Sequence, residues 1–386
     1  MSNTPHLFAP LSLRSVTLPH RIVVSSMCQY SSQDGFASDW HLVHLGSRAV
    51  GGAALVMTEA TAVTPEGRIS PQDLGIYKDE HIDKLRSITD FLHEQGSYAG
   101  IQLAHSGRKG STARPWEGGK ELSVAAGGWT DVLAPSAVPF SSDYPKPVEL
   151  DAKGIQRIRN SFVTATQRAL AAGFDVIELH AAHGYLLHEF LSPLSNRRAD
   201  QYGGTFENRV RLLLEITEDV RKGWPEERPL FVRISATDWL EDPNTGKAAN
   251  GTASGDELGW TLEQSIKLAG QLRERGVDLI DVSSGGNLAT AQIPSGPGYQ
   301  TRFAERIRRE AKIATGSVGM ITDPVQADHI IRSGQADVVF LARQMLRDPY
   351  FPLTAARALK QEISWPVQYT RAADGKPPVR QRLEKS

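Results

Sequence analysis

The sequence predicts a single eight-stranded (β/α)8 barrel, the TIM-barrel fold of the α/β class. Eight short apolar segments alternate with amphipathic segments of helical period, and no Gly-x-Gly-x-x-Gly motif follows the first of them. Such alternation is typical of parallel strands joined by helices, and the missing motif argues against an open, doubly wound sheet. The length of 386 residues suits one barrel with long insertions.

The predicted strands are nearly continuous apolar runs, as expected of strands that are buried on both faces. They cover residues 21–27, 53–59, 98–103, 175–180, 230–235, 277–283, 317–322 and 336–342. Insertions at about 105–150 and 237–259 follow the third and fifth strands, so we expect them to lie over the C-terminal mouth of the barrel, where barrel active sites form. We assign 1–365 to the barrel and 366–386 to a polar tail that we expect to be mobile from residue 372.

Four helices have recognisable ends. Thr261 and Gln264 have capping-box spacing, and the pair Asp323–Pro324 is typical of a helix start. Glycines follow each helix as C-terminal caps. The predicted helices cover residues 80–95, 151–172, 261–275 and 323–333.

The composition excludes several classes of function. Lys and Arg total 43 and Asp and Glu 44, so no general positive field attracts nucleic acid or an anionic membrane. No apolar run approaches the roughly 18 residues of a membrane span, and the N-terminus does not resemble a signal peptide, so we expect a cytoplasmic protein. The single cysteine, Cys28, excludes an internal disulfide and a four-thiolate iron-sulfur or zinc site. Redox chemistry therefore requires an organic cofactor.

Polar residues at the C-terminal ends of the strands face the catalytic mouth of a barrel. After the fourth strand, His180 and His183 are three residues apart and Tyr185 follows. If that turn is helical, the two imidazoles converge on one oxygen and stabilise the enolate that forms when hydride adds to a conjugated alkene, while Tyr185 supplies the proton. Two alternatives remain at this stage: structural hydrogen bonding of both histidines, and a zinc site completed by His188.

Further candidates follow other strands. Residues 25–31 end the first strand and place Cys28 and Tyr30 at the mouth, although both are also ordinary packing residues. Gln102 ends the third strand, where its amide suits a pyrimidine-like ring. Arg233 in the fifth strand needs an anion, either a bound ligand or an internal partner such as Glu178. The loops after the last two strands, with Arg343, suit a phosphate, as they also would in isomerases and aldolases.

These residues lie in motifs that resemble the Old Yellow Enzyme family over residues 8–371, in its thermophilic-like subclass of FMN-dependent ene-reductases, which includes YqjM and xenobiotic reductase A. The matching motifs are MCQYS (27–31), TEA (58–60), IQLAHSGRK (101–109), HAAHGYLLHEFLSPLSNRRADQYGG (180–204) and LARQMLRDP (341–349). The resemblance implies noncovalent FMN, with NADPH or NADH as hydride donor.

The resemblance also implies residue roles. Around the flavin ring it places Ser25, Ser26, Met27, Cys28, Ala60 and Gln102, and near the ribityl phosphate Arg233, Gly319, Ala342 and Arg343. His180 and His183 would anchor the substrate, Tyr185 would donate the proton and Tyr30 would contact the substrate. The implied reaction is ping-pong: the nicotinamide reduces FMN and leaves before an α,β-unsaturated carbonyl or nitro compound accepts hydride.

In that subclass an arginine near the C-terminus reaches into a neighbouring subunit, which suggests Arg371 for this role and a homodimer or dimer-built tetramer. The sequence departs from the family at Ser26, where a proline is usual, and at Ala342, where glycine is common; the tail beyond Arg371 is also long. The main alternatives are a phosphate-binding isomerase or aldolase, for which no Schiff-base lysine or set of metal-binding carboxylates stands out, and a flavin-binding protein without turnover. The iron-sulfur dienoyl-CoA reductases are excluded by the cysteine count.

Overall fold

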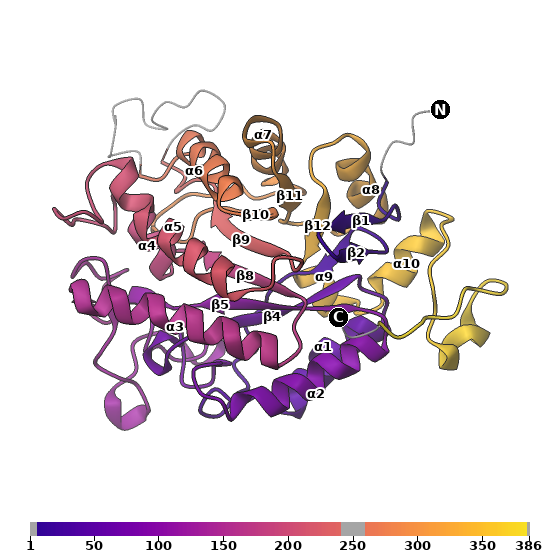
Figure 1. Ribbon diagram of the computed structural model, residues 1–386, viewed down its shortest axis with the longest axis horizontal. Helices are drawn as coiled ribbons and strands as arrows, with labels where there is room; N and C mark the ends of the chain where they lie inside the picture. Colours follow the sequence, from indigo (N-terminus) through magenta and orange to yellow (C-terminus); the bar gives the residue numbers. More distant parts are fainter. Residues whose placement is uncertain (1–5, 241–258, 384–386) are drawn as a thin grey trace.

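The computed structural model describes residues 6–240 and 259–383. Its centre is a closed barrel of eight parallel strands surrounded by helices, which confirms the predicted TIM barrel (Figure 1). Each strand pairs with the next barrel strand along the chain, and the last pairs with the first. The barrel strands are β3 (Ile22–Val24), β4 (Leu55–Ala62), β5 (Tyr98–Ala104), β8 (Val176–Ala181), β9 (Leu230–Ser235), β10 (Leu279–Ser283), β11 (Ala314–Ser317) and β12 (Val338–Leu341).

The helices fill the connections between these strands, and the four predicted helices all form. Asp151 caps the second of these helices by accepting a hydrogen bond from the Gly154 amide, and Thr261 and Gln264 form the expected capping box. The helices are α1 (Asp39–Val50), α2 (His81–Glu94), α3 (Ala152–Ala171), α4 (Leu186–Leu191), α5 (Phe206–Gly223), α6 (Leu262–Glu274), α7 (Thr301–Ala311), α8 (Pro324–Arg332), α9 (Arg343–Arg347) and α10 (Phe351–Ala358).

The seventh predicted strand, 317–322, was wrong in position. The strand is β11, which ends at Ser317, and the apolar residues after it form a loop. Gly319 has φ +118° and Met320 φ +50°, backbone conformations that no strand contains. The Val318 carbonyl instead accepts a hydrogen bond from the Gln300 side chain, so this segment turns toward the start of α7.

The N-terminal end of the barrel is closed by apolar packing. An antiparallel hairpin of β1 (Leu11–Leu13) and β2 (Val16–Leu18) covers it. Val16 and Leu18 belong to a buried cluster with Leu55 and Phe231 from the barrel strands. This end therefore has a structural role, and the open end of the barrel lies at the opposite, C-terminal side.

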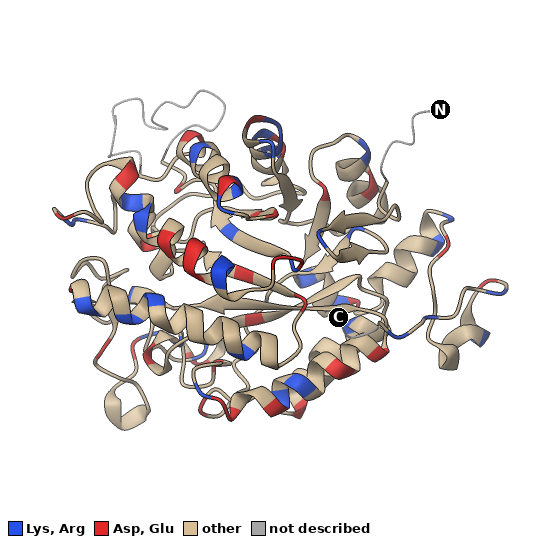
Figure 2. Ribbon diagram, in the orientation of Figure 1, with Lys and Arg blue, Asp and Glu red and all other residues tan. Residues whose placement is uncertain are grey.

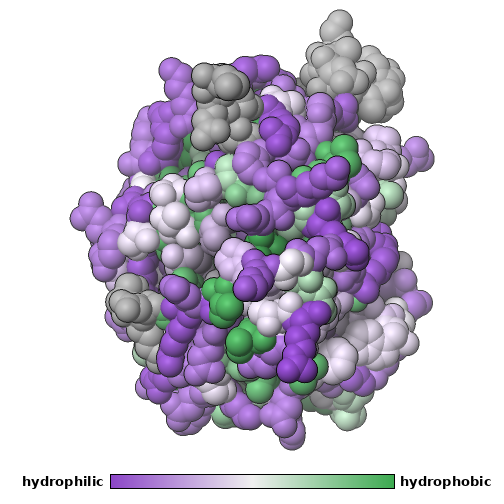
Figure 3. Space-filling model, turned by 90° about the vertical axis from the view of Figure 1, so that its right-hand side faces the viewer, coloured by the Kyte–Doolittle hydropathy of each residue, from purple (hydrophilic) through white to green (hydrophobic). Residues whose placement is uncertain are grey.

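The tail is attached to this closed end, contrary to the expectation that it is mobile from residue 372. The Arg380 guanidinium donates to the carbonyls of Ala49 and Val50 at the end of α1 and to that of Ser364. The Leu383 amide donates to the His93 carbonyl in the last turn of α2. Figure 3 looks onto this side of the molecule, where apolar residues lie in small groups among hydrophilic ones.

The first insertion, 105–150, lies beyond the C-terminal end of β5 and contains a two-stranded pair, β6 (Leu133–Ala134) and β7 (Val148–Glu149). Most of the second, 241–258, lies outside the described residues. Acidic and basic side chains are interspersed along the outer helices (Figure 2); Arg159 of α3, for example, pairs with Glu215 and Asp219 of α5. Within the described part of the chain, no helix is long and apolar enough to cross a membrane.

Candidate active site

The structure brings the two predicted histidines and the tyrosine together where β8 ends. His180 is buried inside this strand, and its Nε2 lies 3.4 Å from Nδ1 of His183. The centre of the Tyr185 ring lies 5.2 Å from that of His180. The turn between the histidines is not helical, as the convergence argument assumed, because His183 adopts φ +60°. The left-handed conformation of His183, two residues after the end of β8, brings the rings together instead.

Several groups hold this strained turn in place. The His183 amide donates to Ser235 Oγ over 2.9 Å, and Lys109 Nζ donates to the His183 carbonyl over 2.7 Å and to that of Gly286. Gly184 lies so close to Gly286 that a Cβ on it would be 2.3 Å from the Gly286 oxygen. The sequence analysis assigned no role to Lys109, although its position just after β5, within a family motif, was a usable signal.

Burial sets the charge of these side chains. It lowers the pKa of His180 and His183 well below the ordinary value, and the charge of Arg233 adds to the effect. Burial also raises the pKa of Tyr185 well above its usual range, and it lowers the pKa of Lys109 to about 7, with Arg108 contributing. At neutral pH the mouth therefore holds two uncharged imidazoles and a protonated phenol.

The segment after β3 lines another side of the mouth. The hydroxyl oxygens of Ser25 and Ser26 are buried and have no hydrogen-bond partner in the described structure. Burial, followed by the charges of Asp73 and Glu59, raises the pKa of the Cys28 thiol well above its usual value, so this thiol is protonated and a poor nucleophile. Tyr30 has φ +50° and its ring contacts that of Trp116 edge-on.

A layer of buried polar side chains crosses the barrel below the histidines. Arg233 Nε lies 3.1 Å from Asp281 Oδ2, so the internal partner is Asp281 of β10 and not Glu178. The Gln102 amide nitrogen donates one N–H to Glu178 Oε1 over 2.7 Å, which leaves its second N–H and its oxygen for a ligand. Ala60 is the register neighbour of Gln102 on β4. Burial, with the nearby Asp281, raises the pKa of Glu178 to about 8.

The four residues expected near a phosphate line one cavity of about 230 Å³ at the C-terminal ends of β9 to β12. Arg233 forms its inner wall, and Arg343 lies at the exposed start of α9. Ala342 has φ −100°, which alanine adopts without strain. Sequence reasoning had not named its other polar lining residues, which include Ser283, Tyr299, Gln300, Gln344 and Arg347.

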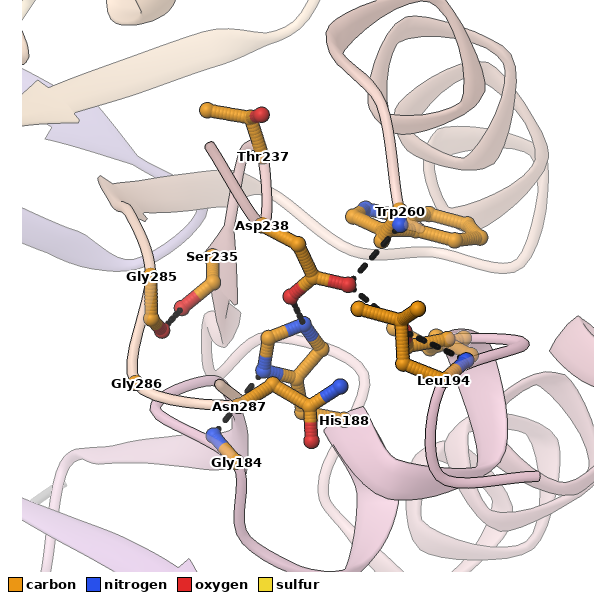
Figure 4. Close-up of polar contacts among 12 residues, drawn as sticks. Gly184, His188, Leu194, Ser235, Thr237, Asp238, Trp260, Gly285, Gly286 and Asn287 are labelled. Atoms are coloured by element: carbon orange, nitrogen blue, oxygen red, sulfur yellow. Dashed lines mark hydrogen bonds and ion pairs between the residues drawn. The ribbon is translucent and has the colours of Figure 1, made fainter. Parts of the chain in front are cut away.

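His188 does not join the other two histidines, so the zinc alternative fails. Its Nδ1 accepts a hydrogen bond from the Gly184 amide, and its Nε2 faces Asp238 at 3.3 Å (Figure 4). Among the described residues no group of three or more potential ligands is placed to hold a metal ion. Arg371 is exposed in a short 3-10 helix, η6 (Val367–Ala372), which follows α10 along the chain, and it does not line the cavity at the mouth.

A model of the NADH:flavin oxidoreductase / NADH oxidase family matches residues 6–362. The chain belongs to this family. The resemblance to the Old Yellow Enzyme family is thereby confirmed, as are the predictions of an enzyme, of FMN and of a reduced nicotinamide donor. The match decides against a phosphate-binding isomerase or aldolase.

Curated relatives have nearly the same length as this chain. It is 48% identical to an NADPH dehydrogenase of Geobacillus sp. WCH70 and 47% identical to one of Bacillus subtilis 168, each over 367 residues that cover 95% of this chain and 98% of the relative. Among solved structures, morphinone reductase superposes with a TM-score of 0.74 at 27% identity, covering 94% of this chain and 92% of that one. A second structure of that protein contains tetrahydroNAD.

The mouth of the barrel fits FMN on chemical grounds. A flavin ring needs hydrogen-bond donors and acceptors along its pyrimidine edge, and a phosphate needs cations. Ser25 and Ser26 each have a buried hydroxyl oxygen with no hydrogen-bond partner in the described structure. The cavity at the ends of β9 to β12 carries three arginines, Arg233, Arg343 and Arg347.

Proposed function

We propose that the protein is an ene-reductase that uses NADPH or NADH to reduce the C=C bond of α,β-unsaturated carbonyl and nitro compounds. The observation that carries this proposal is the cluster of His180, His183 and Tyr185 at the end of β8. The printed names of the relatives, NADPH dehydrogenase and morphinone reductase, are consistent with it.

FMN, when bound, supplies the hydride transfer between the nicotinamide and the alkene. We assign residues 1–365 to its binding domain. The residues proposed to hold its ring are Ser25, Ser26, Met27, Cys28, Ala60 and Gln102, and those for its ribityl phosphate are Arg233, Gly319, Ala342 and Arg343. The protonated Cys28 thiol suits a hydrogen-bonding role beside the ring and makes a covalent role unfavourable.

The side chains of the mouth perform the remaining tasks. Because His180 and His183 are uncharged, each carries one N–H that could be donated to the carbonyl or nitro oxygen and stabilise the negative charge that develops there. The substrate's oxygen would replace present contacts, because His183 Nε2 lies 2.7 Å from Ser283 Oγ and His183 Nδ1 lies 3.4 Å from His180 Nε2. Because burial raises the pKa of Tyr185, its hydroxyl keeps its proton until the α-carbon becomes basic enough to take it. Tyr30 borders the space for the substrate.

The nicotinamide and the alkene would use this one pocket in turn, which is a ping-pong reaction. Anaerobic stopped-flow absorbance tests it: NADPH should bleach the yellow enzyme, and 2-cyclohexenone should restore the colour. A protein that bleaches without recolouring would contradict enone reduction, and a colourless protein that cannot be reconstituted with FMN would contradict the flavin site.

We further propose a homodimer or dimer-built tetramer in which Arg371, in the tail 366–386, reaches a neighbouring subunit's mouth. Its exposed side chain, which is not part of the cavity lining at its own mouth, supports this role. Arg371→Ala should then change enone kinetics without loss of FMN. Unchanged kinetics in an oligomer verified by light scattering would contradict the proposal.

A further inference from the structure

A buried pair behind the histidine turn has no role in the reaction described so far. The pair is His188 of α4 and Asp238, which follows β9, and both side chains are fully buried. His188 Nδ1 accepts the Gly184 amide hydrogen bond over 2.9 Å, and Nε2 lies 3.3 Å from Asp238 Oδ1 (Figure 4). Gly184 directly follows His183, so the pair is one peptide unit away from an imidazole of the mouth.

Every group that faces Asp238 is a donor. Its Oδ2 accepts from Ser192 Oγ over 2.5 Å and from the Trp260 amide over 2.8 Å, while Oδ1 faces the His188 ring. Burial opposes a charge here, but these donors outweigh it and lower the pKa of the Asp238 carboxyl below its ordinary value. The Asp238 amide also donates to the Trp260 carbonyl over 2.8 Å, which holds the carboxylate in place.

The contacts fix which nitrogen of His188 carries the proton. Nδ1 accepts the hydrogen bond of the Gly184 amide, so the proton is on Nε2. Nε2 faces Asp238 Oδ1 at 3.3 Å, an electrostatic contact that is not aligned as a hydrogen bond. If the proton were on Nδ1 instead, it would face the Gly184 N–H, and two donors would oppose each other. The contacts therefore connect the left-handed turn at His183 to Asp238, which follows β9.

We propose that His188 and Asp238 are positioning residues that hold the Gly184 amide and so set the direction of the His183 imidazole toward the substrate. The inference rests on the proposed function, in which His183 binds the substrate's oxygen. Neither residue hydrogen-bonds to His183 or Tyr185 directly, so their effect passes through the turn at Gly184, which joins the two. The double-mutant cycle below tests whether it reaches His183, whose ring is also held by Ser283.

The chain offers a matched control at the closed end of the barrel. His93 Nε2 lies 2.7 Å from Asp175 Oδ2, which also accepts from the Ala99 amide. This second buried histidine–aspartate pair lies in the last turn of α2 and just before β8, at the opposite end of that strand from His183. Asp175→Asn and Asp238→Asn are thus the same chemical change at the two ends of one barrel.

The experiment compares the holoenzymes of these variants. Asp238→Asn puts an amide N–H₂ against at least one donor, so the turn should shift; a displacement of about 1 Å at a reacting group costs up to roughly a hundredfold. We expect the KM for 2-cyclohexenone and the dissociation constant of cyclohexanone, a saturated analogue followed by flavin absorbance, to rise at least roughly tenfold. Asp175→Asn should lower the melting temperature but leave both constants within about twofold, as independent distant sites do.

A double-mutant cycle separates positioning from general damage. If Asp238 acts through His183, Asp238→Asn should add little to His183→Ala, because the same interaction is already lost. Full additivity, or an unchanged KM in folded Asp238→Asn, would overturn the inference. If His183→Ala itself leaves the KM unchanged, the proposed anchoring role is what fails.

A second pair of variants covers the case in which Asp238→Asn does not fold. His188→Gln keeps one acceptor and one donor, whereas His188→Leu has neither. We expect the glutamine variant to retain cyclohexanone affinity better than the leucine variant by roughly tenfold. Equal affinities in the two holoenzymes would count against the inference.

Discussion

The two ends of the barrel bury polar groups in different ways. At the closed end, buried cations and imidazoles hydrogen-bond to backbone carbonyls. His20 pairs with the carbonyl of Gly52, and Arg21 donates to those of Ala9, Pro10 and Asp337. Arg380 donates to the carbonyls of Ala49 and Val50, at the C-terminal end of α1. At the mouth, buried atoms of Ser25, Ser26, Glu178 and His180 have no hydrogen-bond partner in the described structure. A buried polar atom without a partner costs about 1–3 kcal/mol. The closed end also has such atoms, Arg48 Nε and His93 Nδ1, but several of its buried arginines and imidazoles lie against carbonyls, so the mouth is the end better adapted to a ligand.

The largest loss of activity should follow from substituting His180, one of the two histidines at the mouth. His180→Ala removes one donor to the substrate's oxygen, and loss of such a donor typically lowers turnover by about 10²–10³-fold. We expect this loss in kcat/KM for 2-cyclohexenone, with FMN content unchanged by absorbance. Retained turnover would remove His180 from the anchoring role and weaken the contrast between the two ends.

The next largest effect should be on FMN affinity, through Arg343 in the cavity at the mouth. Arg343→Ala removes a cation from its lining, and a charge-assisted hydrogen bond contributes about 1.5–3 kcal/mol. Because Arg343 is exposed, we expect the lower end of that range, or roughly a tenfold weaker FMN dissociation constant by fluorescence titration. Arg380→Ala, at the closed end, is the control and should leave FMN binding unchanged.

Lys109 should make kcat/KM depend on pH. With a pKa lowered to about 7, its ammonium is present below that pH and is lost above it, so its bonds to the His183 and Gly286 carbonyls weaken as pH rises. The kcat/KM for a neutral enone should fall by up to roughly fivefold through pH 7, the difference between a charged and a neutral hydrogen bond. Lys109→Met should abolish this inflection; if the inflection persists, another group causes it.

Lys109 also has an effect on stability, of opposite sign to its effect on activity. Between pH 7 and the ordinary lysine pKa, the unfolded chain binds a proton that the folded chain has released, so this group makes stability increase with pH. Melting temperatures across pH 6–9 test this: relative to Lys109→Met, the wild type should gain stability as pH rises, whereas the raised pKa values of Glu178 and Glu189, about 8, act in the opposite direction in both proteins.

The closed end should affect stability and not activity. Arg380→Ala breaks hydrogen bonds to three carbonyls, and we expect a loss of about 2 kcal/mol, which lowers the melting temperature by several degrees. Differential scanning calorimetry on the holoenzyme measures it. An unchanged melting temperature would mean that the tail contributes nothing to the closed end.

Sequence patterns predicted the barrel well where strands are continuous apolar runs; the strand at 230–235 matches β9 at both ends. They failed at β11, because backbone turns at Gly319 and Met320 interrupt a run of apolar residues that resembles a strand. Four of the barrel's helices had readable ends, whereas α1, α5 and α7 were not assigned.

At the site, residue type and position at a strand end identified His180, His183 and Tyr185, but not how the turn brings them together. A left-handed histidine depends on contacts from Lys109, Ser235 and Gly286, which are distant in sequence. The partners of Arg233 and His188 were missed for the same reason. Asp281 and Asp238 lie about fifty residues further along the chain, and only closure of the barrel brings them near.

The attachment of the tail at the closed end has a practical consequence. The last described residue, Leu383, is held beside the end of α2, and Leu7 near the start of the chain bonds to Asp328 of α8. Anchoring a single chain to a support through its C-terminus would therefore leave that chain's own mouth facing solution. An immobilised preparation should keep its access to both nicotinamide and alkene.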